Sequence, residues 1–165
     1  AQAAVAFEAA ITAAQKTAPE LPLVEEIAAA VVAHGRAADA MASLDTVRGQ
    51  PGAHVCAAAL LAACYAAGDS GVTDVMIDDE LAAAAPELPG SALALRRLER
   101  RARKAGASER RELAAELDAL AHAAAGEGMS AVDRARLHFL RAGLYEDDPE
   151  TRDRAEDASS NGLAF

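Results

Sequence analysis

The sequence predicts an all-α protein built from antiparallel helix pairs, and three observations support that prediction. Just over half of the 165 residues are apolar, yet aromatic residues make up only 3% and the excess is alanine. Alanine is the best helix former and fills little space, so closely packed helices are expected. Glycines follow apolar stretches at regular intervals, with prolines or further glycines about halfway between them. The third observation is a repeat, because the letters APELP occur at 18–22 and again at 85–89.

Four glycines mark the expected helix ends. They follow apolar stretches at intervals of 33, 38 and 37 residues: Gly35, Gly68, Gly106 and Gly143. Glycine just after an apolar-periodic run is typical of a helix C-terminus, because it adopts the left-handed conformation without a Cβ penalty. Proline and glycine clusters lie between these positions, at 19–22, 49–52, 86–90 and 126–128. Proline removes a backbone donor and disfavours helix in the residue before it, so these clusters should separate helices.

The expected elements follow from these breakers. A first helix is expected over 1–17, and helix pairs over 21–34 and 36–48, 53–67 and 69–84, 91–105 and 108–125, and 130–143 and 149–158. APELP would then be the loop between successive pairs, two repeat units apart, since 67 positions separate Pro19 from Pro86. We expect residues 1–165 to form one domain of about four helix pairs plus an N-terminal helix. We also expect the chain to be trimmed or cut from a larger protein.

A period near 34 residues with two helices per repeat is typical of a helical solenoid. The best repeat, 21–51, places apolar and small residues at Val24, Ile27, Val31, Gly35, Ala40 and Leu44. This resembles the tetratricopeptide (TPR) pattern, including its G-x-x-x-x-A-x-x-x-L core. The resemblance extends over most of the chain and is strong over about one repeat. It implies a right-handed TPR-like α-solenoid, and the alternative is an irregular helical bundle with evenly spaced loops.

The resemblance also implies a binding groove lined by the first helix of each pair. On the second such helix, Tyr65 is expected to face this groove. On the last one, the family pattern places Val132, Ala135, Phe139 and Gly143 on the packing side. It places Asp133, Leu137, Leu140 and Arg141 on the groove side.

The most unusual stretch of the chain is a cluster of basic residues. Residues 95–111 hold eight basic and two acidic residues, a net charge of +6 in a chain of −10. Arg96, Arg100 and Arg103 recur at i, i+4 and i+7, on one face of a helix. The candidate binding residues are therefore Arg96, Arg100, Arg103, Lys104, Tyr65 and Arg141. The alternative is a solvated face whose arginines are paired within the chain, for example with Glu112 or Glu116.

These features indicate a non-catalytic scaffold that binds a protein segment, preferably acidic, in the groove. The alternative is a regulatory, ligand-sensing helical domain of a bacterial regulator that binds a small molecule. A charged, open groove would favour the first and a closed apolar cavity the second. The charge of −10 argues against general nucleic-acid binding, because phosphates are held mainly by Lys and Arg.

The sequence contains no motif typical of catalysis, cofactor binding or metal binding, so we expect none of these functions. The four histidines, His34, His54, His122 and His138, have no i, i+4 partner, and the acidic MIDDE at 76–80 lacks the spacing of a calcium loop. The longest uncharged run, 55–68, is too short to span a bilayer. We expect a cytoplasmic protein, and the Ala/Arg-rich composition suggests a bacterial source.

The two cysteines are expected to be buried and free. Cys56, Leu60 and Cys64 lie at i, i+4 and i+8, roughly on one face of a helix. At 1.5 Å per residue the cysteines are about 12 Å apart, too far for a disulfide. Free thiols suggest a reducing compartment.

Overall fold

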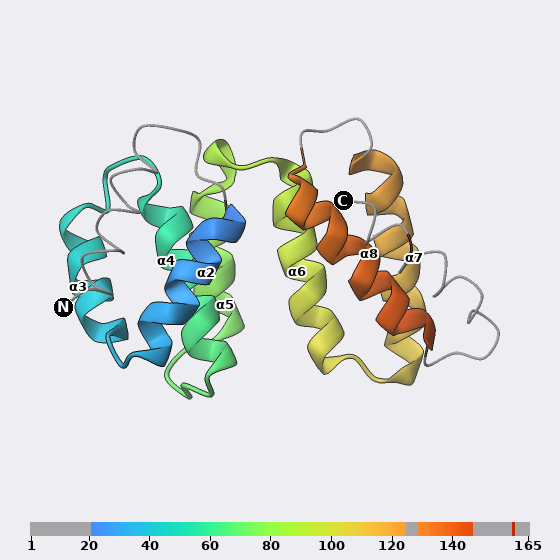
Figure 1. Ribbon diagram of the computed structural model, residues 1–165, viewed down its shortest axis with the longest axis horizontal. Helices are drawn as coiled ribbons and strands as arrows, with labels where there is room; N and C mark the ends of the chain where they lie inside the picture. The colour runs from blue at the N-terminus through green and yellow to red at the C-terminus, as the bar shows by residue number, and fades with distance from the viewer. Residues whose placement is uncertain (1–20, 125–128, 147–159, 161–165) are drawn as a thin grey trace. The chain divides into compact units, whose positions relative to one another are not determined.

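Figure 1 shows the computed structural model, which describes residues 21–124 and 129–146 together with residue 160. The described residues form seven α-helices and one short 3-10 helix, and they contain no strand. The predicted all-α class is therefore confirmed. The chain divides into two compact units, Ala1–Leu88 and Pro89–Phe165. The boundary between them falls inside the second APELP.

The first unit contains four described α-helices. They are α2 (Leu21–Ala33), α3 (Ala37–Thr46), α4 (Ala53–Ala66) and α5 (Asp74–Ala83), followed by the 3-10 helix η1 (Ala85–Glu87). α4 packs chiefly against α2 and α5 and also contacts α3. The core of the first unit combines large and small side chains, such as Leu44 and Leu60 with Ala28 and Ala59. The small residues allow close approach of the helices, as the alanine-rich composition predicts.

Gly35 and Gly68 end helices in the predicted manner. Their φ angles are 68° and 88°, in the left-handed region. After α2, the amide of Arg36 donates to the carbonyl of Val31 at 3.0 Å, and after α4 the amide of Asp69 donates to Cys64 at 3.1 Å. These i to i−5 bonds are those of a Schellman motif, which satisfies carbonyls that the helix end leaves without a partner.

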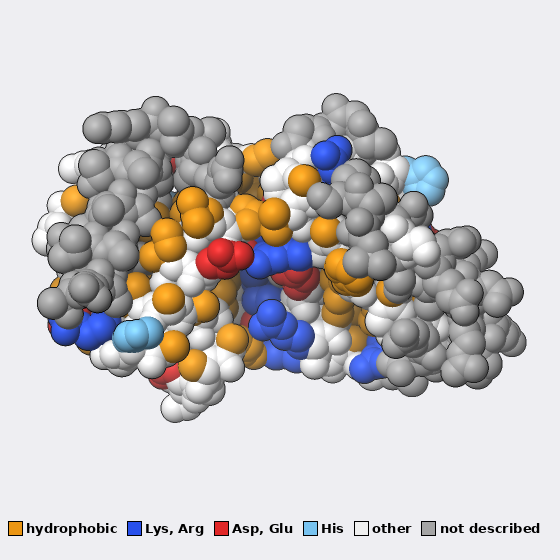
Figure 2. All heavy atoms as spheres, viewed as in Figure 1, with side chains coloured by type: hydrophobic (Ala, Val, Ile, Leu, Met, Phe, Trp, Pro, Cys, Tyr) orange, Lys and Arg blue, Asp and Glu red, His pale blue; other side chains and the backbone are white. Residues whose placement is uncertain are grey.

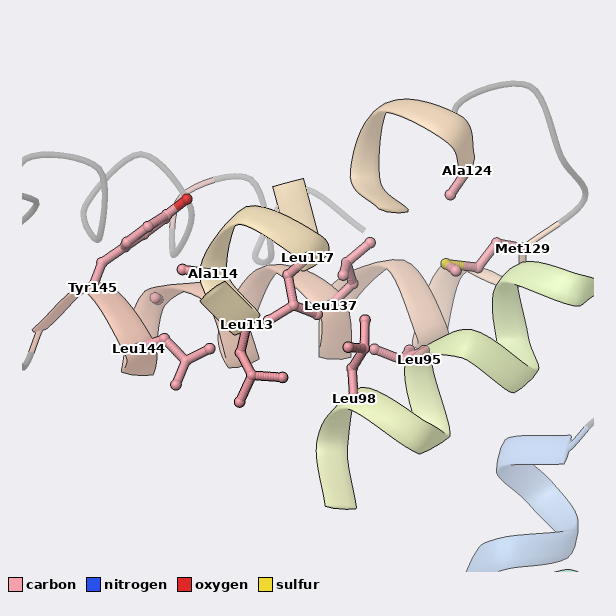
Figure 3. Packing of buried hydrophobic residues seen from close by; sticks show 11 residues of the cluster. Leu95, Leu98, Leu113, Ala114, Leu117, Ala124, Met129, Leu137, Leu144 and Tyr145 are labelled. Carbon is pink, nitrogen blue, oxygen red and sulfur yellow. The ribbon is translucent and has the colours of Figure 1, made fainter. Parts of the chain in front are cut away.

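The second unit contains three described helices. They are α6 (Gly90–Lys104), α7 (Ala107–Ala124) and α8 (Ala131–Glu146), and each contacts the other two. Figure 3 shows leucines from all three helices pointing into a common core. Leu95 of α6, Leu113 and Leu117 of α7, and Leu137 of α8 are each at most 1% exposed. This core fixes the helices on which the basic residues lie.

Two of the predicted helix limits are wrong. Gly143 does not end a helix, because α8 continues to Glu146. The helix expected from residue 69 begins at Asp74, because the Asp69 carboxylate accepts a bond from the Gly71 amide at 2.9 Å and holds a turn there. Thr73 caps α5 by accepting from the Met76 amide.

Gly106 lies in the turn between α6, which ends at Lys104, and α7. Among the glycines described by the structure, the three with positive φ are Gly35, Gly52 and Gly68. Gly106 thus separates two helices without the left-handed conformation on which its prediction was based. The helices expected over 1–17 and 149–158 lie outside the described residues.

The predicted burial of Cys56, Leu60 and Cys64 is confirmed, and both cysteines are free. Burial, followed by the negative charge of Glu87, raises the pKa of the Cys56 thiol to about 11. Burial likewise raises the pKa of Cys64, with a further contribution from Asp69. Both thiols therefore remain protonated and poorly nucleophilic near neutral pH.

We expect thiol-specific labelling of the native protein at pH 8 to be slow. With a pKa of about 11, only about one Cys56 side chain in a thousand is a thiolate at that pH, and its side chain is fully buried. The rate should increase by at least 100-fold in denaturant, where thiols have pKa values of about 8.5. Stopped-flow absorbance with a chromogenic disulfide would measure both rates. Rapid native labelling of two thiols per chain would contradict this packing.

Candidate functional site

The predicted row of arginines on α6 does not present one uniform surface. Arg96 is buried, and its Nη1 lies 2.6 Å from Oδ1 of Asp133 on α8. The two side chains are only 5% and 3% exposed. Arg96 thus joins two helices inside the second unit and is not part of an exposed binding surface.

The other basic residues of α6 lie in different environments. Arg100 is half-buried, and its Nη1 donates to the carbonyl of Arg96 at 3.4 Å. Arg103 and Lys104 are exposed. Arg101, which lies off the predicted row, pairs with Glu116 of α7 at 2.7 Å, and this hydrogen bond and charge raise its pKa. Internal pairing therefore occurs at Arg96, within the predicted row, and at Arg101, outside it. In Figure 2, Lys and Arg side chains gather over the region where Figure 1 labels α6.

The second unit contains a solvent-open hollow of about 520 Å³ between side chains of its three helices, which we call the arginine groove. α6 contributes Glu99, Ala102 and Arg103, and α7 contributes Arg110. α8 contributes its Arg136, Phe139, Leu140, Gly143 and Leu144. The α8 residues are spaced at i, i+3, i+4, i+7 and i+8, which is one face of a helix. The groove therefore has an apolar floor, mainly from α8, and charged groups from three helices.

The charges of the arginine groove are mostly positive. Three guanidinium groups, Arg103, Arg110 and Arg136, line it with one carboxylate, Glu99. The Nε of Arg110 donates to the carbonyl of Ala105 at 3.4 Å, which anchors that side chain near the turn between α6 and α7. Guanidinium groups present several donors in a planar fork that suits carboxylates. The arrangement can bind an anionic group beside an apolar one.

Of the predicted binding residues, only Arg103 lines this groove. Arg110 and Arg136 were not predicted, although Arg110 belongs to the basic cluster at 95–111. On α8, Leu140 lies on the groove side as predicted, but four other residues do not lie on the predicted side. Asp133 and Leu137, expected in a groove, are 2% and 1% exposed, whereas Val132 and Phe139, expected to pack, are 49% and 47% exposed. Asp133 contacts Arg96 of α6 inside the unit instead of facing a groove.

Arg141 is bound within the second unit. Its Nε and Nη2 lie 2.8 and 2.5 Å from Oδ1 of Asp118 on α7. The hydroxyl of Tyr145 donates to Oδ2 of the same carboxylate at 2.6 Å, and burial followed by this bond raises the Tyr145 pKa. Nδ1 of His138 lies 3.1 Å from Nη1 of Arg141, and burial followed by this positive charge lowers the pKa of His138. These contacts hold α7 against α8, so Arg141 serves the fold.

Tyr65, the remaining candidate, belongs to the first unit. It is half-buried in α4, and its hydroxyl lies 3.5 Å from Oδ2 of Asp74 at the start of α5. This contact connects two neighbouring helices. Lys104 is exposed on α6 and is not among the residues that line the arginine groove.

In the first unit, polar contacts join α5 and η1 to α4 and to the segment before it. The side chain of Glu80 on α5 is only 12% exposed. Its Oε2 lies 2.7 Å from Nδ1 of His54, and its Oε1 lies 3.2 Å from Nη1 of Arg48. Glu87 of the second APELP accepts the Gly52 amide at 2.6 Å. Within the described ranges, no group of three His, Cys, Asp or Glu side chains could hold a metal ion.

The chain shows no match to a protein-family model, to a curated protein or to a solved structure. Among the helices that the structure describes, none has the length and apolar character needed to cross a bilayer. Any functional conclusion must therefore come from the groove itself.

Proposed function

We propose that this chain is a non-catalytic protein-interaction domain that binds an acidic segment of a partner protein in the arginine groove. The main support is the convergence of arginines from α6, α7 and α8 on one open hollow, in a chain whose net charge is −10. A positive site on a negative body attracts an acidic segment locally and repels it elsewhere. The free, buried cysteines are consistent with a cytoplasmic location.

We further propose that the helix pairs belong to a right-handed, TPR-like solenoid. In such a solenoid the first helices of successive pairs are neighbours. Within the first unit α2 contacts α4, and within the second α6 contacts α8, as this arrangement requires. In addition, α2 and α4 are each followed by a glycine with positive φ, as the repeat pattern predicts.

A small-molecule sensor is the second candidate. A closed apolar cavity of drug-sized volume would favour it. The arginine groove is instead open and carries four charged side chains. This composition favours an extended partner segment over an enclosed ligand.

Binding of an acidic probe should depend on the groove arginines. The probe is a fluorescein-labelled 12-residue peptide of eight Asp and Glu residues with Phe, Leu, Gly and Ser, followed by fluorescence anisotropy. Replacing Arg103, Arg110 and Arg136 by Ala should weaken its binding by at least 10-fold and flatten the salt dependence, because charge pairing is lost.

The matched control removes an equal number of positive charges from outside the groove. Arg97, Arg101 and Arg111 are exposed, lie in the same basic stretch and do not line the groove. Their triple Ala variant should bind within about threefold of the unaltered protein, the small change expected of charges outside the contact. Circular dichroism would confirm that both variants fold, and an Arg-to-Lys triple variant at the groove would retain part of the affinity. Equal weakening by both Ala variants, or none by either, would refute the proposed site.

A further inference from the structure

The last turn of α8 contains a glycine that the backbone does not require. Gly143 lies within a continuous helix, and it is not among the described glycines with positive φ. A Cβ built at this position meets no atom within 4 Å, so no close contact excludes a side chain. Alanine, the commonest residue of this chain, would make the helix more stable. Gly143 lines the arginine groove, so its lack of a side chain leaves room there.

Apolar side chains surround that space. Gly143 lines the groove together with Phe139, Leu140 and Leu144 of α8 and Ala102 of α6. Phe139 is 47% exposed although it is one of only three phenylalanines in the chain. Large exposed aromatic residues beside a hollow are typical of binding surfaces, because burying them on binding is favourable.

We propose that the arginine groove binds its acidic segment through one large apolar side chain, aromatic or leucine-like, which lies over Gly143 and against Phe139. Carboxylates that flank this anchor in the partner then contact the guanidinium groups of Arg103, Arg110 and Arg136. This inference rests on the proposed function and adds the specificity of the site. An acidic segment without the anchor binds through charge alone, and therefore weakly and with strong salt dependence.

A peptide series on the unaltered protein tests the anchor directly. Three 9-residue probes carry Phe, Leu or Ala at the centre of an otherwise identical Asp/Glu/Gly sequence, and anisotropy gives each dissociation constant at 150 mM salt. We expect the Phe and Leu probes to bind at least 10-fold more tightly than the Ala probe. Equal affinities that still require the three arginines would refute the anchor and leave the acidic-segment function intact. No binding by any probe would refute both.

Two substitutions at Gly143 test the place of the anchor. Gly143→Ala should raise the melting temperature and retain most of the affinity, since it adds one methyl group. Gly143→Leu should keep the helix and occupy the space over residue 143 where the anchor lies, so affinity for the Phe probe should fall by at least 10-fold toward that of the Ala probe. Unchanged affinity of folded Gly143→Leu would overturn the proposed location.

A matched pair on α8 provides the control. Phe139 and Val132 are 47% and 49% exposed and lie seven residues apart, and only Phe139 lines the groove. Phe139→Ala should weaken the Phe probe by at least fivefold, whereas Val132→Ala should leave it unchanged. Equal effects of the two substitutions would argue against a defined anchor pocket. These variants do not depend on the folding of Gly143→Leu.

Discussion

Replacing Asp133 by alanine should lower the free energy of unfolding of the second unit by about 3–5 kcal/mol. The substitution leaves the guanidinium of Arg96, 5% exposed, inside the unit without the carboxylate that lies 2.6 Å from it. Removing one partner of a buried ion pair costs far more than removing a contact between exposed groups. Urea denaturation followed by circular dichroism would measure the change.

An exposed pair of the same chemistry is the control. Arg36 and Asp39 of the first unit also lie 2.6 Å apart, but their side chains are 40% and 59% exposed. Asp39→Ala should cost less than about 1 kcal/mol, because water screens and replaces the interaction. Replacing both buried partners, Arg96→Met with Asp133→Leu, should restore much of the stability lost in Asp133→Ala. Similar costs for the two Asp substitutions would contradict the buried placement.

Leu60→Ala should destabilise the first unit by about 2–5 kcal/mol. Leu60 is fully buried on α4, within the cluster that includes Leu44 and Cys56. Its truncation removes apolar contact and leaves a cavity that neighbouring alanines cannot fill. Denaturation midpoints would show the loss, and the Cys56 thiol should become labelled faster because it lies in the same cluster.

Leu23→Ala is the matched control, since Leu23 is 53% exposed on the neighbouring helix α2. Its effect should stay within about 0.5 kcal/mol, as for most surface substitutions. The core assignment would be wrong if Leu60→Ala changed neither the midpoint nor the labelling rate.

The helices could be predicted because their signals are local. Gly35 and Gly68 end α2 and α4 with the φ angles that glycine alone adopts easily, and proline-containing segments separate the pairs. Gly143 is also a glycine that follows an apolar run, yet it lies inside α8. A glycine marks a helix end only when the following residues provide the capping bonds, and single letters do not encode those bonds.

The site was only partly predictable because it depends on partners far apart in sequence. The excess of arginine at 95–111 is visible from composition, and this stretch contains Arg103 and Arg110, which line the arginine groove. The partner of Arg96 is Asp133, on another helix, and no local spacing connects them. α8 has apolar residues on two faces, so periodicity alone could not decide between Leu137 and Phe139 as the buried one. Leu137 is buried because it packs in a cluster with residues of α6 and α7, whereas Phe139 is exposed.

The contact between Arg96 and Asp133 also bears on how α6 and α8 find their alignment. Sliding one helix past another by a turn of about 5.4 Å exchanges apolar neighbours for other apolar neighbours. A slid arrangement would separate the two charges while both stay buried, at a cost of several kcal/mol. We infer that this ion pair fixes the register of the two helices during folding. The ion pair thereby disfavours misaligned arrangements in which the apolar faces of the helices still meet.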